Sequence, residues 1–98
     1  MYNIEFDPEF KEELDDLGLE NPDDHDVIIR KIKDIAKALE WNFNHHKNLR
    51  RPLNKFKRVH VNDHFVLVFR VNQWNKTVCF IAYGHHDDIY KDKRLFEY

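Results

Sequence analysis

Three runs of strand length between residues 56 and 90 are rich in Val, Ile, Phe and Tyr, which favour β-strands. Residues 56–62 alternate, which predicts one face with Phe56, Arg58 and His60 and another with Lys57, Val59 and Val61. Residues 64–72 are apolar on both faces, which is typical of a central strand, and residues 77–83 are nearly as apolar. The short polar connections between the runs predict an antiparallel meander that ends at Gly84.

The first 18 residues predict a strand followed by a helix. Residues 2–6 alternate, so Tyr2, Ile4 and Phe6 are expected on the buried face of a short strand. Asp7 followed by Pro8 is typical of a helix start, with Asp as the N-cap. An apolar stripe follows at helical spacing, formed by Phe10, Leu14 and Leu17. Gly18 is expected to end this helix and residues 19–22 to form the turn.

A second, longer helix is predicted to begin at a cap formed by Asp23 or Asp24. Its apolar stripe is core and not a ligand site; it consists of Ile28, Ile32, Ile35 and Leu39, widened by Ile29 and Ala36. The helix is expected to fray over residues 41–44. The whole pattern predicts one α+β domain over residues 1–98 in the order β-α-α-β-β-β, with the helix hairpin on one face of a four-stranded sheet.

Charge is distributed unevenly along the chain. Residues 1–40 hold 5 lysines and arginines against 13 acidic residues, a balance of −8, whereas residues 41–98 hold 11 against 5, a balance of +6. Six of the seven histidines also lie in the second part. This asymmetry predicts a basic cleft on the sheet side, which is the usual footprint of a phosphate-bearing partner. Attraction between two oppositely charged halves is the other explanation.

Cysteine content and hydropathy indicate the compartment. Cys79 is the only cysteine, so an intrachain disulfide is excluded, and its place within a strand predicts a small buried hydrophobe. No apolar run approaches the ~20 residues of a membrane span, and no signal peptide opens the chain. A cytoplasmic protein with no membrane partner is expected.

Several titratable residues lie close together directly after the last strand, in residues 84–90, Gly-His-His-Asp-Asp-Ile-Tyr. Together with the strand Phe-Val-Leu-Val-Phe-Arg-Val (residues 65–71) and the polar turns, this layout resembles the C-terminal sheet of the RelE/ParE superfamily of toxin–antitoxin toxins. Within it, the chain is most similar to the YafQ-like ribosome-dependent mRNA interferases. Their pattern of a His on the first meander strand and a closing Gly-x-His-x-x-Leu-Phe is met by His60 and residues 84–90. The resemblance extends over nearly the whole chain.

The resemblance implies a metal-independent endoribonuclease that needs no cofactor. It would cleave mRNA in the ribosomal A site through attack of a 2′-hydroxyl on the adjacent phosphate. The resemblance also implies a cognate antitoxin protein that wraps and neutralises the toxin.

Such cleavage needs a base for the 2′-hydroxyl proton, an acid for the 5′-oxygen and cations for the phosphate. The residues expected to act in catalysis, from their positions and the family pattern, are His60, His86, His64 and Tyr90. Those expected to bind RNA phosphates are Arg51, Arg58 and Lys57, of which Lys57 is the weakest because alternation places it on the Val59 face.

The chain departs from the YafQ-like pattern at three places. Asp63-His64-Phe65 stands where those proteins carry Pro-Asp-Trp, so His64 replaces a catalytic Asp. Arg51 replaces the His of a His-Pro-Leu motif, and Val66 occupies a position where many RelE-type members carry Arg.

Two other functions stay open. One is a metal site at His45-His46 or at residues 85–88; we expect none, because adjacent ligands on one strand diverge and no zinc-ligand spacing is present. The other is a non-cleaving member of the fold, either a ParE-like toxin directed at DNA gyrase or an inactive binding module. The many histidines argue against the ParE branch.

Overall fold

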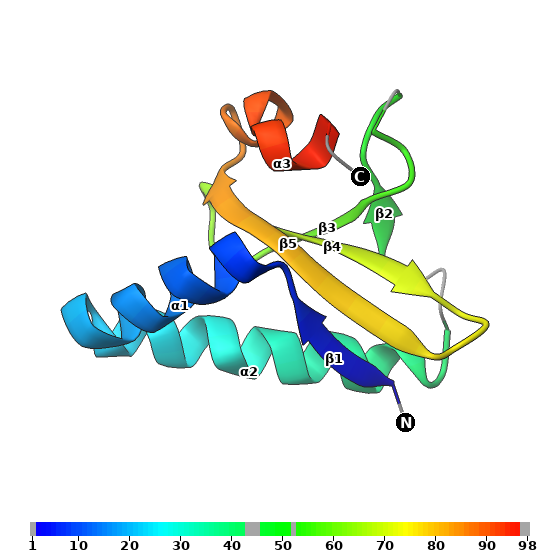
Figure 1. Cartoon of the computed structure of the whole chain (residues 1–98), viewed down its shortest axis with the longest axis horizontal. Helices are drawn as coiled ribbons and strands as arrows, with labels where there is room; N and C mark the ends of the chain where they lie inside the picture. The colour runs from blue at the N-terminus through cyan, green and yellow to red at the C-terminus, as the bar shows by residue number, and fades with distance from the viewer. Residues whose placement is uncertain (1, 43–45, 52, 97–98) are drawn as a thin grey trace.

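A five-stranded mixed sheet forms the centre of the structure, a computed structural model that describes residues 2–42, 46–51 and 53–96. The elements in chain order are β1 (Asn3–Phe6), α1 (Pro8–Glu20), α2 (Pro22–Leu39), β2 (Lys47–Asn48), β3 (Lys57–His60), β4 (Phe65–Asn72), β5 (Thr77–His85), the 3-10 helix η1 (Ile89–Lys91) and α3 (Lys93–Phe96). The strand order is β1-β5-β4-β3-β2, with β1 parallel to β5 and the other pairs antiparallel (Figure 1). The α+β class and the meander are confirmed. The short edge strand β2 was not predicted, so the sheet has five strands where four were expected. The short helices η1 and α3 were not predicted either.

The start of α1 is as predicted, but its end is not. The Asp7 carboxylate accepts hydrogen bonds from the backbone N–H groups of Glu9 and Phe10, at 3.0 and 3.2 Å. The prediction that Gly18 ends the helix is wrong, because α1 continues to Glu20. A Cβ on Gly18 would lie 3.2 Å from the His25 ring, so the glycine allows α1 and α2 to pack closely.

A single residue, Asn21, separates the two helices. It closes α1 through its N–H to the Leu17 carbonyl and caps α2 by accepting from the Asp24 N–H at 3.3 Å. The cap predicted at Asp23 or Asp24 is therefore wrong, because Pro22 already begins α2 and both aspartates lie in its first turn, near the positive end of the helix dipole.

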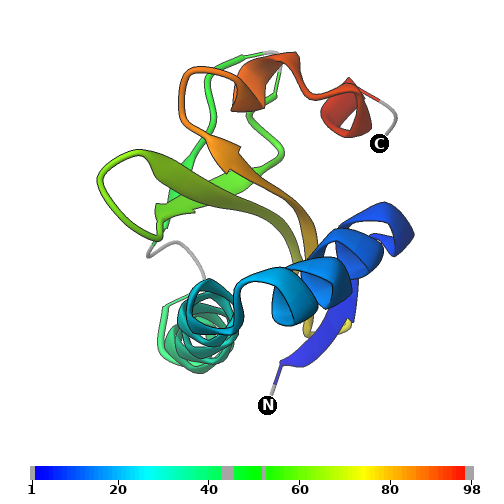
Figure 2. The same cartoon turned by 90° about the vertical axis from the view of Figure 1, so that its left-hand side faces the viewer.

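Each face of the sheet has its own hydrophobic core. The helix-side core holds the predicted stripes of α1 and α2 against inward residues of β4 and β5 such as Phe69 and Phe80. The opposite core, which we call the second core, lies under the loop before β3, η1 and α3 (Figure 2). Of the first strand, Tyr2 is buried and Phe6 half-buried, but Ile4 is exposed, contrary to prediction. β1 is an edge strand, so one side of it lacks a neighbour.

A β-bulge in β5 sets the direction of its last side chains. Val68 pairs with Ala82 but Phe69 pairs with Phe80, so Ile81 is an extra residue in β5. Both Ile81 and Ala82 therefore pack in the second core, and the alternation beyond them is reversed. No helix in the described residues combines the length and apolar character that a membrane crossing needs.

Candidate functional site

A cleft of about 470 Å³ opens on the sheet face opposite α1 and α2. It is lined by Asn48, Arg50, Arg58, His60, Asp63, Val66, His86, Asp87, Ile89 and Tyr90. Four of the seven side chains predicted for function therefore line one cleft, and they come from two segments: β3 and the stretch after β5.

β3 supplies Arg58 and His60. Their register partners on β4 are Val68 and Val66, which both belong to the second core. Arg58 is half-buried and His60 exposed, and both side chains line the cleft. The prediction that they share a face of β3 is confirmed.

The segment after β5 is a tight turn anchored at both ends. The His86 N–H donates to the His64 carbonyl at 2.8 Å, and the Asp88 N–H donates to the His85 carbonyl at 2.9 Å. Ile89 is 3 % exposed and fixes the turn in the second core. His86 itself is exposed, and its Nδ1 lies 3.0 Å from an oxygen of the Asp87 carboxylate. A neutral His86 that donates from Nδ1 carries its lone pair on Nε2.

Arg50 is a cleft residue that was not predicted. Its guanidinium lies 5.2 Å from the centre of the half-buried Tyr90 ring, within cation–π range. Arg51, the predicted phosphate ligand, is exposed and does not line the cleft. Leu49 and Leu53 are buried in the second core and anchor the loop that carries both arginines. These two apolar positions are the feature of the sequence that could have distinguished Arg50 from Arg51.

Lys57 lies on the other face of the sheet from the cleft. Its side chain is only 6 % exposed, and its ammonium donates to the His46 carbonyl at 3.3 Å and to the Asn48 side-chain oxygen at 3.0 Å. Burial lowers the pKa of Lys57. The structure therefore does not bring Lys57 together with Arg58. The alternation of residues 56–62 already predicted that these two side chains lie on opposite faces of the strand.

His64 stands apart from the cleft lining. Its N–H donates at 2.9 Å to Asn62, whose side chain orders the turn between β3 and β4. The ring stacks on those of His85 and His86, with centroids 5.8 and 6.4 Å away. The argument that neighbouring histidines diverge is wrong here, because the His85 and His86 rings lie 4.5 Å apart.

The other position considered for a metal site, His45-His46, is described only in part. His45 lies outside the described residues, and the His46 ring packs edge-on against Phe69, 5.4 Å away on the helix side. The Cys79 thiol is half-buried against the second core and burial raises its pKa, as fits a small hydrophobe rather than a nucleophile.

A second hollow, of about 540 Å³, lies around the β4–β5 turn and includes Glu5, Arg70 and the exposed Trp74. No histidine is among its described lining residues. The cleft at His60 and His86 therefore carries the stronger case for chemistry.

Comparisons with known proteins agree with this architecture. A protein from Methanocaldococcus jannaschii named "Putative toxin RelE4" is 45% identical over 97 residues, which cover 99% of each chain. The toxin–antitoxin YoeB–YefM complex from Staphylococcus aureus contains a chain with a TM-score of 0.67 and 22% identity, with 88% of this chain and 98% of that chain covered. A metal-bound toxin from Helicobacter pylori gives a TM-score of 0.69 and 21% identity, with 91% and 99% covered. At these identities the two structures show the fold alone.

The family is shown by the sequence comparisons. Residues 4–90 match the model described as the ParE toxin of the type II toxin–antitoxin system parDE, which spans both helices, the meander and the closing turn. With this match and the relative that is 45% identical along its whole length, the chain belongs to the RelE/ParE superfamily of type II toxin–antitoxin toxins.

Proposed function

We propose that this toxin is a ribosome-dependent endoribonuclease that cleaves mRNA in the A site. The observation that carries the proposal is the cleft, which gathers two imidazoles, two guanidiniums and a phenol ring on one face of the sheet, beside the carboxylates of Asp63 and Asp87. These are the groups that metal-independent RNA cleavage requires, and they come from segments that are far apart in the chain.

The reaction divides between the two histidines. One of the two imidazoles, that of His60 or that of His86, takes the proton of the 2′-hydroxyl while the 2′-oxygen attacks the adjacent phosphorus. The bond from phosphorus to the 5′-oxygen breaks, and the other imidazole, as imidazolium, gives its proton to that oxygen. The products are a 2′,3′-cyclic phosphate and a 5′-hydroxyl. Histidine is suited to either role at neutral pH.

The remaining cleft residues bind and position the RNA. The guanidiniums of Arg50 and Arg58 supply paired donors for phosphate oxygens and offset the charge that develops in the transition state. Tyr90 offers a ring on which an unpaired base stacks. His64, expected as a catalytic acid, supports the cleft through its backbone carbonyl, which accepts from the His86 N–H.

The proposal includes two partners. The YoeB–YefM neighbour is a toxin–antitoxin complex, which supports a cognate antitoxin protein for this chain. The other proposed partner is mRNA in the ribosomal A site, and an action on ribosomes would take place in the cytoplasm.

A gyrase-directed activity is the second candidate, because the matching family model is described as a ParE toxin. Two assays separate the candidates: cleavage of mRNA on ribosomes from the producing organism, and supercoiling of plasmid by DNA gyrase. We expect cleavage products that end in 2′,3′-cyclic phosphate and no loss of supercoiling. Loss of supercoiling with intact mRNA would overturn the proposal in favour of gyrase.

Arg50 and Arg51 form a matched pair for testing whether the cleft arginines bind phosphate. We expect Arg50→Ala to weaken binding of a single-stranded 2′-deoxy oligonucleotide and to reduce the slope of log K against log salt by about 0.7, the value for one lost phosphate contact. The 2′-deoxy probe cannot be cleaved, so fluorescence anisotropy reports binding alone. Arg51→Ala removes the same charge from the neighbouring position outside the cleft and should leave the slope unchanged. Equal effects of the two substitutions would mean that only net charge matters.

A further inference from the structure

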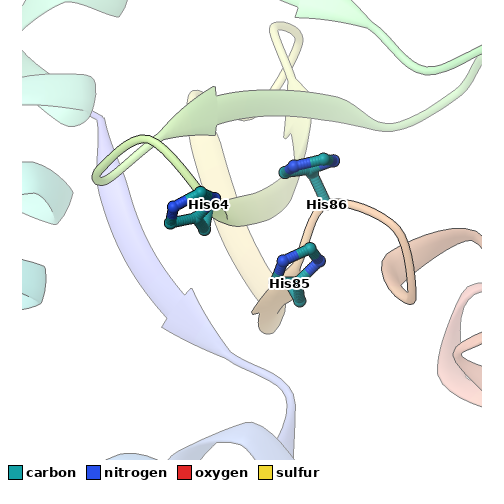
Figure 3. Close-up of side chains that lie close together, drawn as sticks. All are labelled: His64, His85 and His86. Carbon is teal, nitrogen blue, oxygen red and sulfur yellow. The ribbon is translucent and has the colours of Figure 1, made fainter.

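Three histidines form a cluster beside the cleft. His64 comes from the turn between β3 and β4, His85 is the last residue of β5, and His86 follows it in the next turn (Figure 3). One ring nitrogen from each lies within 4.8 Å of the others, and in the described residues this is the one group of three possible metal ligands that meets so closely.

The backbone holds the two segments together without help from the rings. The His86 N–H donates to the His64 carbonyl at 2.8 Å, so the main chains of the two ligand segments are directly bonded. The side chain of Asn62 accepts from the N–H groups of both His64 and Phe65 at 2.9 Å and fixes the turn. The Phe65 ring then packs edge-on against His85, with centroids 5.7 Å apart. The cluster therefore stands on a largely preformed frame.

We propose that the cluster of His64, His85 and His86 binds one divalent transition-metal ion of the kind that prefers imidazole, such as Zn²⁺. Metal–nitrogen bonds of ~2.0–2.1 Å place tetrahedral ligand atoms roughly 3.4 Å apart. Because the three nitrogens lie within 4.8 Å of one another, they must approach by at most about 1.4 Å. Rotation of the exposed His64 and His86 rings supplies this movement, and water completes the coordination.

Asp87 is placed to orient two of the ligands. One carboxylate oxygen lies 3.0 Å from Nδ1 of His86, so a proton on Nδ1 would face this acceptor and leave the lone pair of the ring on Nε2. His85 needs an adjustment, because its Nδ1 accepts from the Asp87 N–H at 3.1 Å. Binding through Nε2 requires the His85 proton to sit on Nδ1, where the other Asp87 oxygen, 3.6 Å away, becomes its acceptor. A carboxylate behind a ligating histidine is a common arrangement in metal sites.

The ion would also control the cleft, and this consequence rests on the proposed function. His86 both lines the cleft and belongs to the cluster. A metal bound to its lone pair prevents the ring from accepting or donating the proton that cleavage moves. Metal occupancy therefore switches the ribonuclease off.

Titration of ZnCl₂ into tag-free, chelator-treated protein tests the site by calorimetry. We expect one ion per chain, with affinity lowered about tenfold or more in His64→Gln and in His85→Gln. His25→Gln, a histidine on α2, is the matched control and should bind as the wild type does. Circular dichroism checks that each variant is folded. Absence of binding, or equal affinity in wild type and His64→Gln, would overturn the proposal.

The switch has its own measurement, the ratio of cleavage rates with and without zinc. The wild type should lose about 100-fold or more of its rate at saturating zinc, the usual contribution of a general acid or base. The zinc concentration that halves the rate should be about tenfold or more higher for His85→Gln than for the wild type. A wild-type rate that zinc leaves unchanged would overturn the switch. A chain that binds zinc through His64 but cleaves nothing would refute the ribonuclease proposal and support the metal site.

Discussion

His86→Gln is expected to lower single-turnover cleavage of ribosome-bound mRNA by ~100-fold or more, the usual contribution of a general acid or base. His86 is exposed at the cleft, and its Nδ1 lies 3.0 Å from an oxygen of the Asp87 carboxylate. Glutamine keeps a polar side chain of similar reach but has no group that titrates near neutrality. The proton transfer assigned to this ring is therefore lost, while the fold is retained.

The control is His25→Gln, which alters a histidine on α2, on the other side of the sheet. It should cleave at the wild-type rate and remain toxic when expressed without antitoxin. Growth arrest by His86→Gln equal to that by the wild type would remove His86 from the mechanism. His60→Gln should resemble His86→Gln, because the reaction needs both an acid and a base.

Arg94→Met is expected to lower the free energy of unfolding by about 2 kcal/mol, which corresponds to a fall in Tm of roughly 10 °C. The Arg94 side chain is only 10 % exposed and is bonded to the carboxylates of Asp92 and Glu13, so it ties α3 to α1. Methionine keeps the apolar stem but leaves the half-buried Asp92 carboxylate without its cation. Urea unfolding at about pH 7 measures the difference.

The same pair gives a pH dependence of defined sign. The hydrogen bonds from Arg94 hold the pKa of Asp92 below its ordinary value of 3.8 in the folded protein. Stability from this pair is therefore complete above that value and is lost as the pH falls through the lowered folded-state pKa. The difference between wild type and Arg94→Met should shrink as the pH falls to about 3.

Lys93→Met is the matched control, since Lys93 is the exposed neighbour of Arg94 on the same short helix. It should change stability by less than about 0.5 kcal/mol at either pH. A difference for Arg94→Met that did not change with pH would mean that lost packing, and not the ion pair with Asp92, explains the destabilisation.

Local sequence patterns were sufficient for most of the secondary structure. The alternation of β3, the apolar run of β4 and the helical stripes of α1 and α2 each depend on the repeat of the element itself. The same reasoning placed Arg58 and His60 on one face, because β3 is regular over its length. Errors arose at the helix boundary, where Gly18 was interpreted as a stop although its role is close packing against His25.

Tertiary structure decided the composition of the site. The bulge at Ile81 sets the sheet face toward which the last side chains of β5 point. A bulge depends on the pairing of β5 with β4, so the periodicity of the β5 sequence alone cannot reveal it. The choice of Arg50 over Arg51 depends on how the buried Leu49 and Leu53 anchor an irregular loop.

The sequence by itself determined the helices α1 and α2, the three meander strands, the two faces of β3 and the family, because these follow from short-range repeats and a local closing motif. Only the folded chain brought His64 beside His85 and His86, since a backbone hydrogen bond links two segments separated by the whole of β4 and β5. Contacts of this kind depend on strand register and turn geometry, which no residue specifies alone.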